Sequence, residues 1–272
     1  MATETHVTTR FDPFIAALTT AVVSVVLLGL ALAYDWLGPD VGEGSAFCEA
    51  LRGDLVNQPA NTFSNLGFVL AGLTIGWRGR KNPQLMDGMV GFFACVVVLL
   101  GPASAAMHAS GTVLGQNLDL TSMFLISSFA ASYAMKRWYE LSRTQFFMAF
   151  AAWLIMGEAV LFSGIAVPVV LHGGNLVFAI GSLTAIVLEV RLWRRQPSKA
   201  VARAGLLTLA VLGGAFTIWL LDQGPWCDPN SLIQGHAVWH FLCAVTTYCQ
   251  FRMYAADTRK QNSQQPNAPS LN

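Results

Sequence analysis

The sequence predicts an all-α integral membrane protein, and three observations support this class. Of the 272 residues, 54% are hydrophobic and only 11% are charged, whereas an ordinary soluble domain carries about 25% charged residues. The apolar residues gather into runs of about 20, the length that an α-helix needs to cross a bilayer. Short segments of alternating hydrophobicity, typical of a membrane β-barrel, are not evident.

We expect a transmembrane helix at each apolar run. The runs are residues 14–34, 61–77, 88–109, 118–135, 145–162, 168–190, 204–221 and 232–251. The first run has two interpretations, a retained helix, which its length favours, or a signal peptide, because Ala31-Leu32-Ala33 resembles a cleavage site. Cleavage would leave the orientation of the remaining helices unchanged.

The basic residues predict the orientation. All but Arg52 of the 16 lysines and arginines lie in segments that alternating spans would leave on one side. By the positive-inside rule this side is cytoplasmic, so both termini are expected there. Segment 35–60, with several carboxylates, would face outward. The net charge of +1 gives no indication of nucleic-acid binding.

A few ionisable side chains interrupt the predicted spans, and they lie at one depth. His108 is near the outer end of its helix, and Asp119 is at the outer start of the next. His236 and His240 are four residues apart near the outer end of the last helix and so share a face, as do Ser104 and His108. Ionisable groups inside a membrane are costly and indicate function by default.

Three imidazoles and a carboxylate at one depth favour a catalytic zinc site. Zinc prefers imidazole nitrogen, and a catalytic site leaves one position open to water. Asp119 could accept a proton from that water or orient it. The spans contain no lysine, which argues against a retinal Schiff base.

These residues belong to an ordered set of short motifs that resembles the alkaline ceramidase family, a group of seven-helix membrane hydrolases related to the adiponectin receptors. The motifs are Cys48-Glu49, Gln58 to Asn65, Ser104-x-x-x-His108, Asp119 with Ser122, Asp222 with Cys227, and His236-Ala237-Val238-Trp239-His240. The resemblance covers about residues 46–254 and implies a seven-transmembrane-helix bundle there. It leaves 1–45 as a cytoplasmic arm, one extra N-terminal transmembrane helix and an outer linker, and 255–272 as a disordered cytoplasmic tail.

The resemblance also implies a site and a reaction. It assigns His108, His236 and His240 to zinc, Asp119 to the reacting water, and Ser104 to a place beside the metal, where it could stabilise an oxyanion. The implied reaction hydrolyses the amide bond of ceramide or a similar N-acyl lipid to a fatty acid and a sphingoid base. The membrane would supply the lipid, the active site would face the extracytoplasmic side, and no protein partner is implied.

The resemblance places a disulfide between Cys48 and Cys227, which both lie in outward segments where disulfides can form. Eukaryotic members also bind calcium through an acidic stretch at this point. Here Glu49 remains but Gln58 stands near a later acidic position, so with so few carboxylates calcium binding is doubtful. The lean loops and the lost acidic stretch favour a bacterial inner membrane over the endoplasmic reticulum or Golgi.

Several further polar or aromatic residues are candidates for the lipid cavity or for support of the metal ligands. They are Glu49, Asn61, Ser64, Asn65, Glu158, His172 and Trp239. For Glu158 and His172 the alternative is a structural hydrogen bond between helices, and for Trp239 it is ordinary packing. Cys95, Cys243 and Cys249 are expected to be small packing residues.

Two other functions stay open at this point. One is a receptor-like or regulatory protein of the same group with a structural zinc, which would need a fourth protein ligand. The other is a proton-coupled transporter, in which Glu158, Asp119 and the histidines form a proton path. Transporters often contain internal repeats, and none stands out here.

Overall fold

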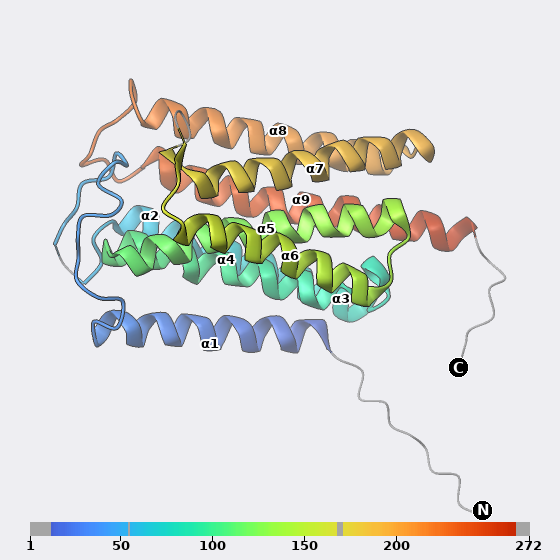
Figure 1. Cartoon of the computed structure of the whole chain (residues 1–272), viewed down its shortest axis with the longest axis horizontal. Helices are drawn as coiled ribbons and strands as arrows, with labels where there is room; N and C mark the ends of the chain where they lie inside the picture. The colour runs from blue at the N-terminus through green and yellow to red at the C-terminus, as the bar shows by residue number, and fades with distance from the viewer. Residues whose placement is uncertain (1–11, 54, 168–170, 265–272) are drawn as a thin grey trace, which may run out of the picture.

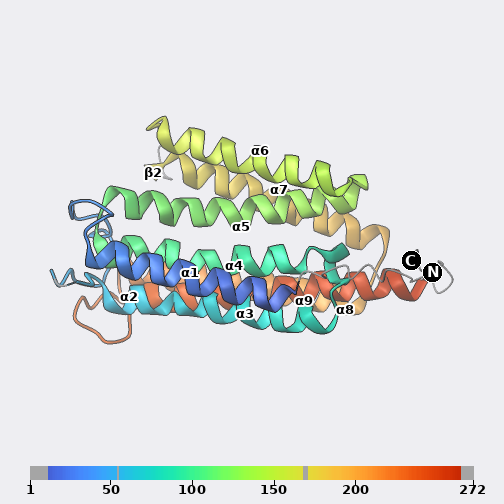
Figure 2. The same ribbon diagram turned by 90° about the horizontal axis from the view of Figure 1, so that it is seen from below.

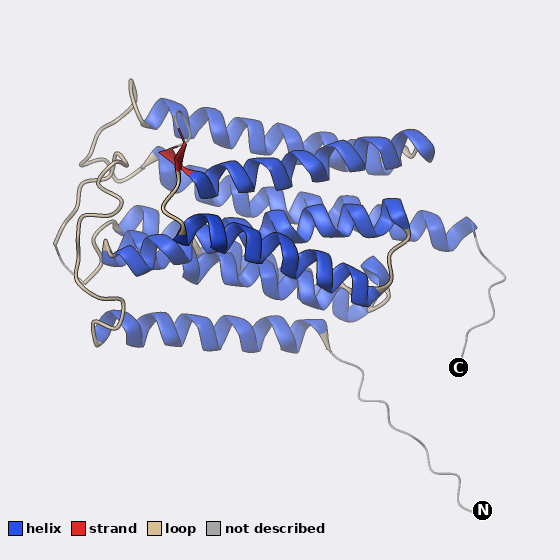
Figure 3. Ribbon diagram, viewed as in Figure 1, coloured by secondary structure: helices blue, strands red, loops and turns tan. Residues whose placement is uncertain are grey.

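The computed structural model describes residues 12–53, 55–167 and 171–264, and most of them are helical (Figure 1). The long helices are α1 (Pro13–Ala33), α3 (Leu66–Lys81), α4 (Val90–Ser110), α5 (Val113–Tyr139), α6 (Arg143–Phe162), α7 (Gly173–Arg195), α8 (Lys199–Asp222) and α9 (Gly235–Gln264). Two short helices precede α3 and α4, namely α2 (Pro59–Ser64) and the 3-10 helix η1 (Leu85–Gly88). A small antiparallel pair of strands, β1 (Ala166–Val167) and β2 (Leu171–His172), stands before α7 (Figure 3).

Among the described residues, six helices are long and apolar enough to cross a membrane: α1, α4, α5, α6, α7 and α8. The chain is therefore a multi-pass helical membrane protein, as predicted. The predicted count of seven helices plus one is not confirmed. Helix α3 has 16 residues, fewer than the roughly 20 of a full crossing, and α9 carries histidine, threonine and arginine side chains that make it more polar.

The long helices lie roughly side by side, so their ends gather at two opposite ends of the bundle (Figure 1). Segments 34–58 and 223–234 lie at one end, which we call the loop end. The turns that follow α3, α5 and α7 lie at the other end, together with the start of α1 and the end of α9. We call this the basic end, because the helix ends beside these turns carry most of the lysines and arginines.

Helix α4 lies between α1, α3 and α5 (Figure 2). Toward the basic end, buried aromatic side chains from α4, α5, α6 and α9 pack together, including Phe93, Phe129, Tyr133, Phe146 and Tyr254. Helix α1 packs on α3 and α4 through small residues such as Ala17. A Cβ atom at Gly76 of α3 would lie 2.9 Å from the Pro13 carbonyl oxygen, so the close approach of α1 requires glycine there.

Helix boundaries differ from the sequence prediction at three places. The predicted span 61–77 is split at Asn65 into α2 and α3. Helix α7 begins at Gly173 rather than 168, because the strands occupy part of the preceding segment. Helix α9 continues through residues 255–264, where a disordered tail was expected, because Ala255 and Thr258 are buried against the bundle.

Candidate metal centre

Three histidines from two helices meet at the loop end. His108 is in the last turns of α4, and His236 and His240 are in the first turns of α9. All three side chains are buried, with exposed fractions of 4% or less. Their potential ligand nitrogens lie within 4.8 Å of one another. The Nε2 atoms of His108 and His236 are 3.2 Å apart. The i, i+4 spacing in α9 therefore places both imidazoles beside His108.

Gln58 determines which nitrogen of His108 is free. The Gln58 Nε2 group donates hydrogen bonds to the carbonyl oxygens of Gly44 (3.0 Å) and Glu49 (2.8 Å), which fixes the orientation of the amide. Its Oε1 atom consequently faces His108 Nδ1 at 2.7 Å. Because an amide oxygen only accepts, Nδ1 carries the proton and Nε2 presents a lone pair to the centre of the cluster.

His240 is oriented by the segment between α2 and α3. Its Nδ1 atom lies 3.1 Å from the Asn61 carbonyl oxygen and 3.0 Å from Ser64 Oγ. The carbonyl can only accept, so Nδ1 donates and Nε2 is left as the ligand atom. Ser64 Oγ and Asn65 Nδ2 donate to the same carbonyl. In a continuous helix this carbonyl would accept from the Asn65 amide, so its use by side chains explains the break at Asn65.

His236 has a different environment. Its Nδ1 atom is buried without a hydrogen-bond partner among the described residues. The ring stacks on Phe47, with centroids 4.0 Å apart and planes at 28°. Phe47 also contacts the His108 ring at 5.2 Å. This aromatic side chain therefore covers two of the three imidazoles from the side of segment 34–58.

Asp222, the last residue of α8, holds the start of α9. Its carboxylate oxygens accept hydrogen bonds from the backbone amides of Gly235 (2.8 Å) and His236 (2.9 Å). The first amides of a helix have no partner within the helix, and a carboxylate there is favourable. A Cβ atom at Gly235 would lie 2.6 Å from Asp222 Cβ, so only glycine permits this approach. The contact sets the position of the turn that carries both α9 histidines.

Glu49 holds α2 in a similar way. Its two carboxylate oxygens each accept a hydrogen bond of 2.8 Å, from the amides of Ala60 and Asn61. The Glu49 side chain is only 2% exposed. Both of its oxygens are thus engaged by the backbone that positions Asn61.

The predicted disulfide between Cys48 and Cys227 is confirmed, with a Cα–Cα distance of 5.4 Å. It joins segment 34–58 to the segment between α8 and α9. Because Cys48 lies between Phe47 and Glu49, the crosslink anchors both residues to the segment that leads into α9. The free cysteines Cys95, Cys243 and Cys249 lie within helices and are at least partly buried.

Asp119 is in the second turn of α5 and is partly buried. The Ser104 side chain of α4 lies beside its carboxylate. Ser104 precedes His108 by one helical turn, so it links Asp119 to the helix that carries this histidine. The structure thus brings together the two residues that the sequence assigned to catalysis.

The remaining predicted residues have other surroundings. Glu158 is on α6, with its Oε1 atom buried and unpaired among the described residues. The ring of Trp239 contacts Phe216 and Trp219 of α8, with centroid distances of 6.2 Å for both. His172 is in β2, and its side chain is outside the described part of the structure.

The donor set fits a zinc ion. Tetrahedral zinc with imidazole nitrogens at about 2.0–2.1 Å requires ligand nitrogens about 3.3 Å apart. The 3.2 Å between the Nε2 atoms of His108 and His236 is close to this spacing. Two of the three imidazoles also donate through Nδ1 to an oxygen, the arrangement that orients histidine ligands around metals.

Sequence reasoning missed three contributions to this site. Gln58 was noted only as a departure from an acidic position, Phe47 had no assigned role, and Asp222 had none. Phe47 and Gln58 come from non-helical positions at the loop end, where periodicity does not predict side-chain direction. The sequence contains a weak indication of the Asp222 contact, because a carboxylate stands at the end of one predicted helix and Gly-His stands at the start of the next.

The fold and the site together define a multi-pass helical membrane protein with a buried three-histidine cluster that could hold a metal ion. Residues 47–271 match a family model described as Ceramidase, and the match covers most of the chain. The chain therefore belongs to the ceramidase family, which confirms the resemblance seen in the sequence. Membership implies an amide hydrolase and supports ceramide hydrolysis in general. No curated protein matches the chain.

Proposed function

We propose that the chain is a zinc-dependent amidase that hydrolyses ceramide or a similar N-acyl lipid within the membrane. The observation that carries the proposal is the convergence of His108, His236 and His240 in a chain of the ceramidase family. The cluster contains these three histidines among the described residues and no fourth histidine, cysteine or carboxylate ligand. An open ligand position favours catalysis over a closed structural site.

The three imidazoles would hold the ion through their inward nitrogens. When bound, zinc acts as a Lewis acid that polarises the amide carbonyl and lowers the pKa of water. The protein contributes orientation: Gln58 and Asn61 hold two of the rings with the correct nitrogen inward. Phe47 covers the rings of His108 and His236 and limits their exposure to water at the loop end.

Asp119 would act as the general base and then as the general acid. It accepts a proton from the attacking water, the C–N bond breaks, and the same proton passes to the leaving nitrogen. The products are a fatty acid and an amine. Ser104 faces the Asp119 carboxylate and would keep it pointed toward the reacting centre. This positioning role would add to the oxyanion contact that the family resemblance implies for Ser104.

The orientation of the chain belongs to the same proposal. The basic end would be cytoplasmic, with both termini on that side, and the histidine cluster would lie toward the extracytoplasmic face. A lipid in that leaflet could then bring its amide to the cluster without leaving the membrane. Residues 46–254 would form the catalytic domain, with α1 as an additional helix at its edge.

The test combines metal analysis with release of fatty acid from a panel of N-acylated lipids. We expect about one zinc per chain and hydrolysis of ceramide or a closely related lipid. Asp119→Asn should keep the metal but lose activity by a factor of about 10² to 10⁴, the usual contribution of a general base. Full activity in this variant would show that the base is another group.

Asp87→Asn is the matched control. Asp87 lies at the basic end, its exposed carboxylate pairs with Lys136 (2.9 Å), and it adopts φ +53°, a conformation that asparagine tolerates. This substitution should leave both metal content and hydrolysis unchanged. Purified protein that holds zinc but cleaves no N-acyl lipid would contradict the proposed activity and favour a regulatory role.

A further inference from the structure

The basic end contains a cavity of about 740 Å³ between α3, α8 and α9. This volume lies within the range of small-molecule and cofactor sites. Its lining includes five basic side chains and no carboxylate: Arg78, Lys81, Arg203, Arg252 and Arg259. Since α9 rises about 1.5 Å per residue, Arg252 is about 18 Å along the helix from His240. The cavity is therefore separate from the histidine cluster.

Among the residues that the structure describes, no ion pair joins any of these five basic side chains to a carboxylate. Arg78 instead lies over the Tyr248 ring, with its guanidinium carbon 5.8 Å from the ring centroid. Unpaired like charges gathered around one cavity repel one another, and an anion in the cavity would relieve this repulsion.

Helix α8 gives an independent indication of an anion. Its first two turns carry Lys199 and Arg203, and its first turn contains no acidic residue. Cations at a helix N-terminus are unfavourable, because the free amides there form the positive end of the helix dipole. Ala200 of this first turn lines the cavity. A bound anion would meet both the amide end of α8 and the surrounding guanidinium groups.

The apolar part of the cavity indicates what the anion is attached to. Leu207 lines it and is 44% exposed, and its neighbour Leu206 is 68% exposed on the surface of a helix long enough to span the membrane. Phe251 of α9 adds an aromatic wall. The basic side chains thus lie beside a surface suited to hydrocarbon chains. Basic pockets between transmembrane helices are typical binding sites for anionic lipid headgroups.

We propose that this cavity binds the phosphate headgroup of an anionic phospholipid from the leaflet at the basic end, with an acyl chain along α8. The positive-inside rule alone explains why basic residues are at this end. It does not explain why these five surround one cavity, whereas Arg191 and Arg194 of α7 lie at the same end without lining it. The site is independent of the proposed hydrolysis.

The test is native mass spectrometry of the full chain in nonionic detergent with phosphatidylglycerol or phosphatidylcholine. Wild type should retain phosphatidylglycerol in preference to phosphatidylcholine. Arg203→Gln with Arg252→Gln should lower phosphatidylglycerol retention by about thirtyfold, given about 1 kcal/mol for each of the two basic residues near an anionic lipid. The matched control, Arg191→Gln with Arg194→Gln, removes the same charge from exposed positions outside the cavity and should retain the lipid as wild type does.

Circular dichroism verifies that each variant folds. If the double variant does not fold, the single variants Arg203→Gln and Arg252→Gln replace it, and each should lose less phosphatidylglycerol retention. Equal retention of the two lipids by wild type would overturn the proposal, as would equal losses in the cavity and control variants. Displacement of phosphatidylglycerol by millimolar glycerol 3-phosphate would assign the site to a soluble phosphate instead and also overturn it.

Discussion

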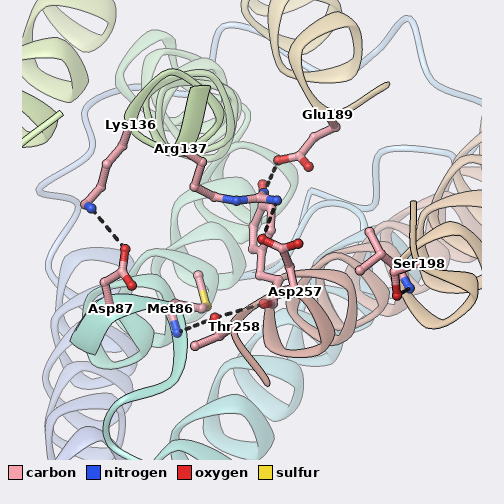
Figure 4. Close-up of polar contacts among 10 residues, drawn as sticks. Met86, Asp87, Lys136, Arg137, Glu189, Ser198, Asp257 and Thr258 are labelled. Carbon is pink, nitrogen blue, oxygen red and sulfur yellow. Dashed lines mark hydrogen bonds and ion pairs between the residues drawn. The ribbon is translucent and has the colours of Figure 1, made fainter. Parts of the chain in front are cut away.

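Two buried polar centres lie at opposite ends of the helix bundle, and they are built differently. At the basic end, Arg137 of α5 donates to Glu189 of α7 (2.6 Å) and to Asp257 of α9 (2.9 Å), as Figure 4 shows. The Arg137 side chain is only 7% exposed. At the loop end, by contrast, two imidazole nitrogens that could both bind a metal face each other. The Nε2 atoms of His108 and His236 are 3.2 Å apart.

The difference distinguishes a structural centre from one that is suited to a ligand. The guanidinium of Arg137 meets opposite charges on two other helices, so its contacts join α5, α7 and α9 without any added group. His108 Nε2 contacts another imidazole nitrogen, His236 Nε2, and a potential ligand atom of His240 lies within 4.8 Å of the ligand atoms of both rings. A cation satisfies all three imidazoles at once. Substitutions at the two ends should therefore separate stability from metal binding.

The largest effect is expected at the metal cluster. His108→Ala removes one of three ligands, so bound zinc should be lost and fatty-acid release should fall on the order of a thousandfold or more. Metal content and hydrolysis, measured on the same preparation, report the change. A variant that keeps stoichiometric zinc and more than a tenth of the activity would remove His108 from the ligand set.

The next largest effect should appear in stability alone. Arg137→Met removes the buried guanidinium that Glu189 and Asp257 share, which should cost about 3–5 kcal/mol of unfolding free energy. Zinc per folded chain should stay at the wild-type value. Adding Glu189→Gln and Asp257→Asn to this variant should restore much of the lost stability, as measured by thermal or denaturant unfolding. A loss of zinc from folded Arg137→Met protein would show that the two ends are coupled.

A smaller effect is expected behind the metal ligands. Gln58→Leu removes the acceptor for His108 Nδ1 and the two donors that hold Gly44 and Glu49. Loss of such an outer partner typically weakens metal binding 10- to 100-fold. Gln250→Leu is the matched control, because Gln250 is part-buried in α9 and its amide donates to Tyr254 Oη near the basic end. Equal zinc affinity in the two variants would exclude a role for Gln58 in ligand orientation.

The sequence predicts the parts of this comparison that depend on periodicity. Helical spacing places His236 and His240 on one face, and alternating topology brings His108 and Asp119 to the same end. Both features follow from the repeat of an α-helix and from the order of the spans. The pairing of Cys48 with Cys227 has another source, because the resemblance to alkaline ceramidases implied it.

The features that periodicity cannot predict come from irregular backbone and long-range pairing. The break at Asn65 arises because the Asn61 carbonyl bonds to His240, a partner 179 residues away. The direction of Gln58 is set by carbonyls of a non-helical segment. The extension of α9 depends on Asp257 meeting Arg137 across the bundle. Each requires the packed structure, because none is a property of a local sequence window.

The smallest predicted effect compares helix caps at the two ends. Asp222→Asn keeps one acceptor for the start of α9 but loses the charge, whereas Ser198→Ala removes the hydroxyl that accepts from Val201 at the start of α8. Each should lower unfolding free energy by about 1 kcal/mol. Only Asp222→Asn should also weaken zinc binding, by a few-fold, because its partner amide belongs to a ligand residue. Titration of zinc into the metal-free variants measures the difference in zinc affinity. Equal affinity in both variants would mean that α9 holds its histidines in place without the Asp222 cap.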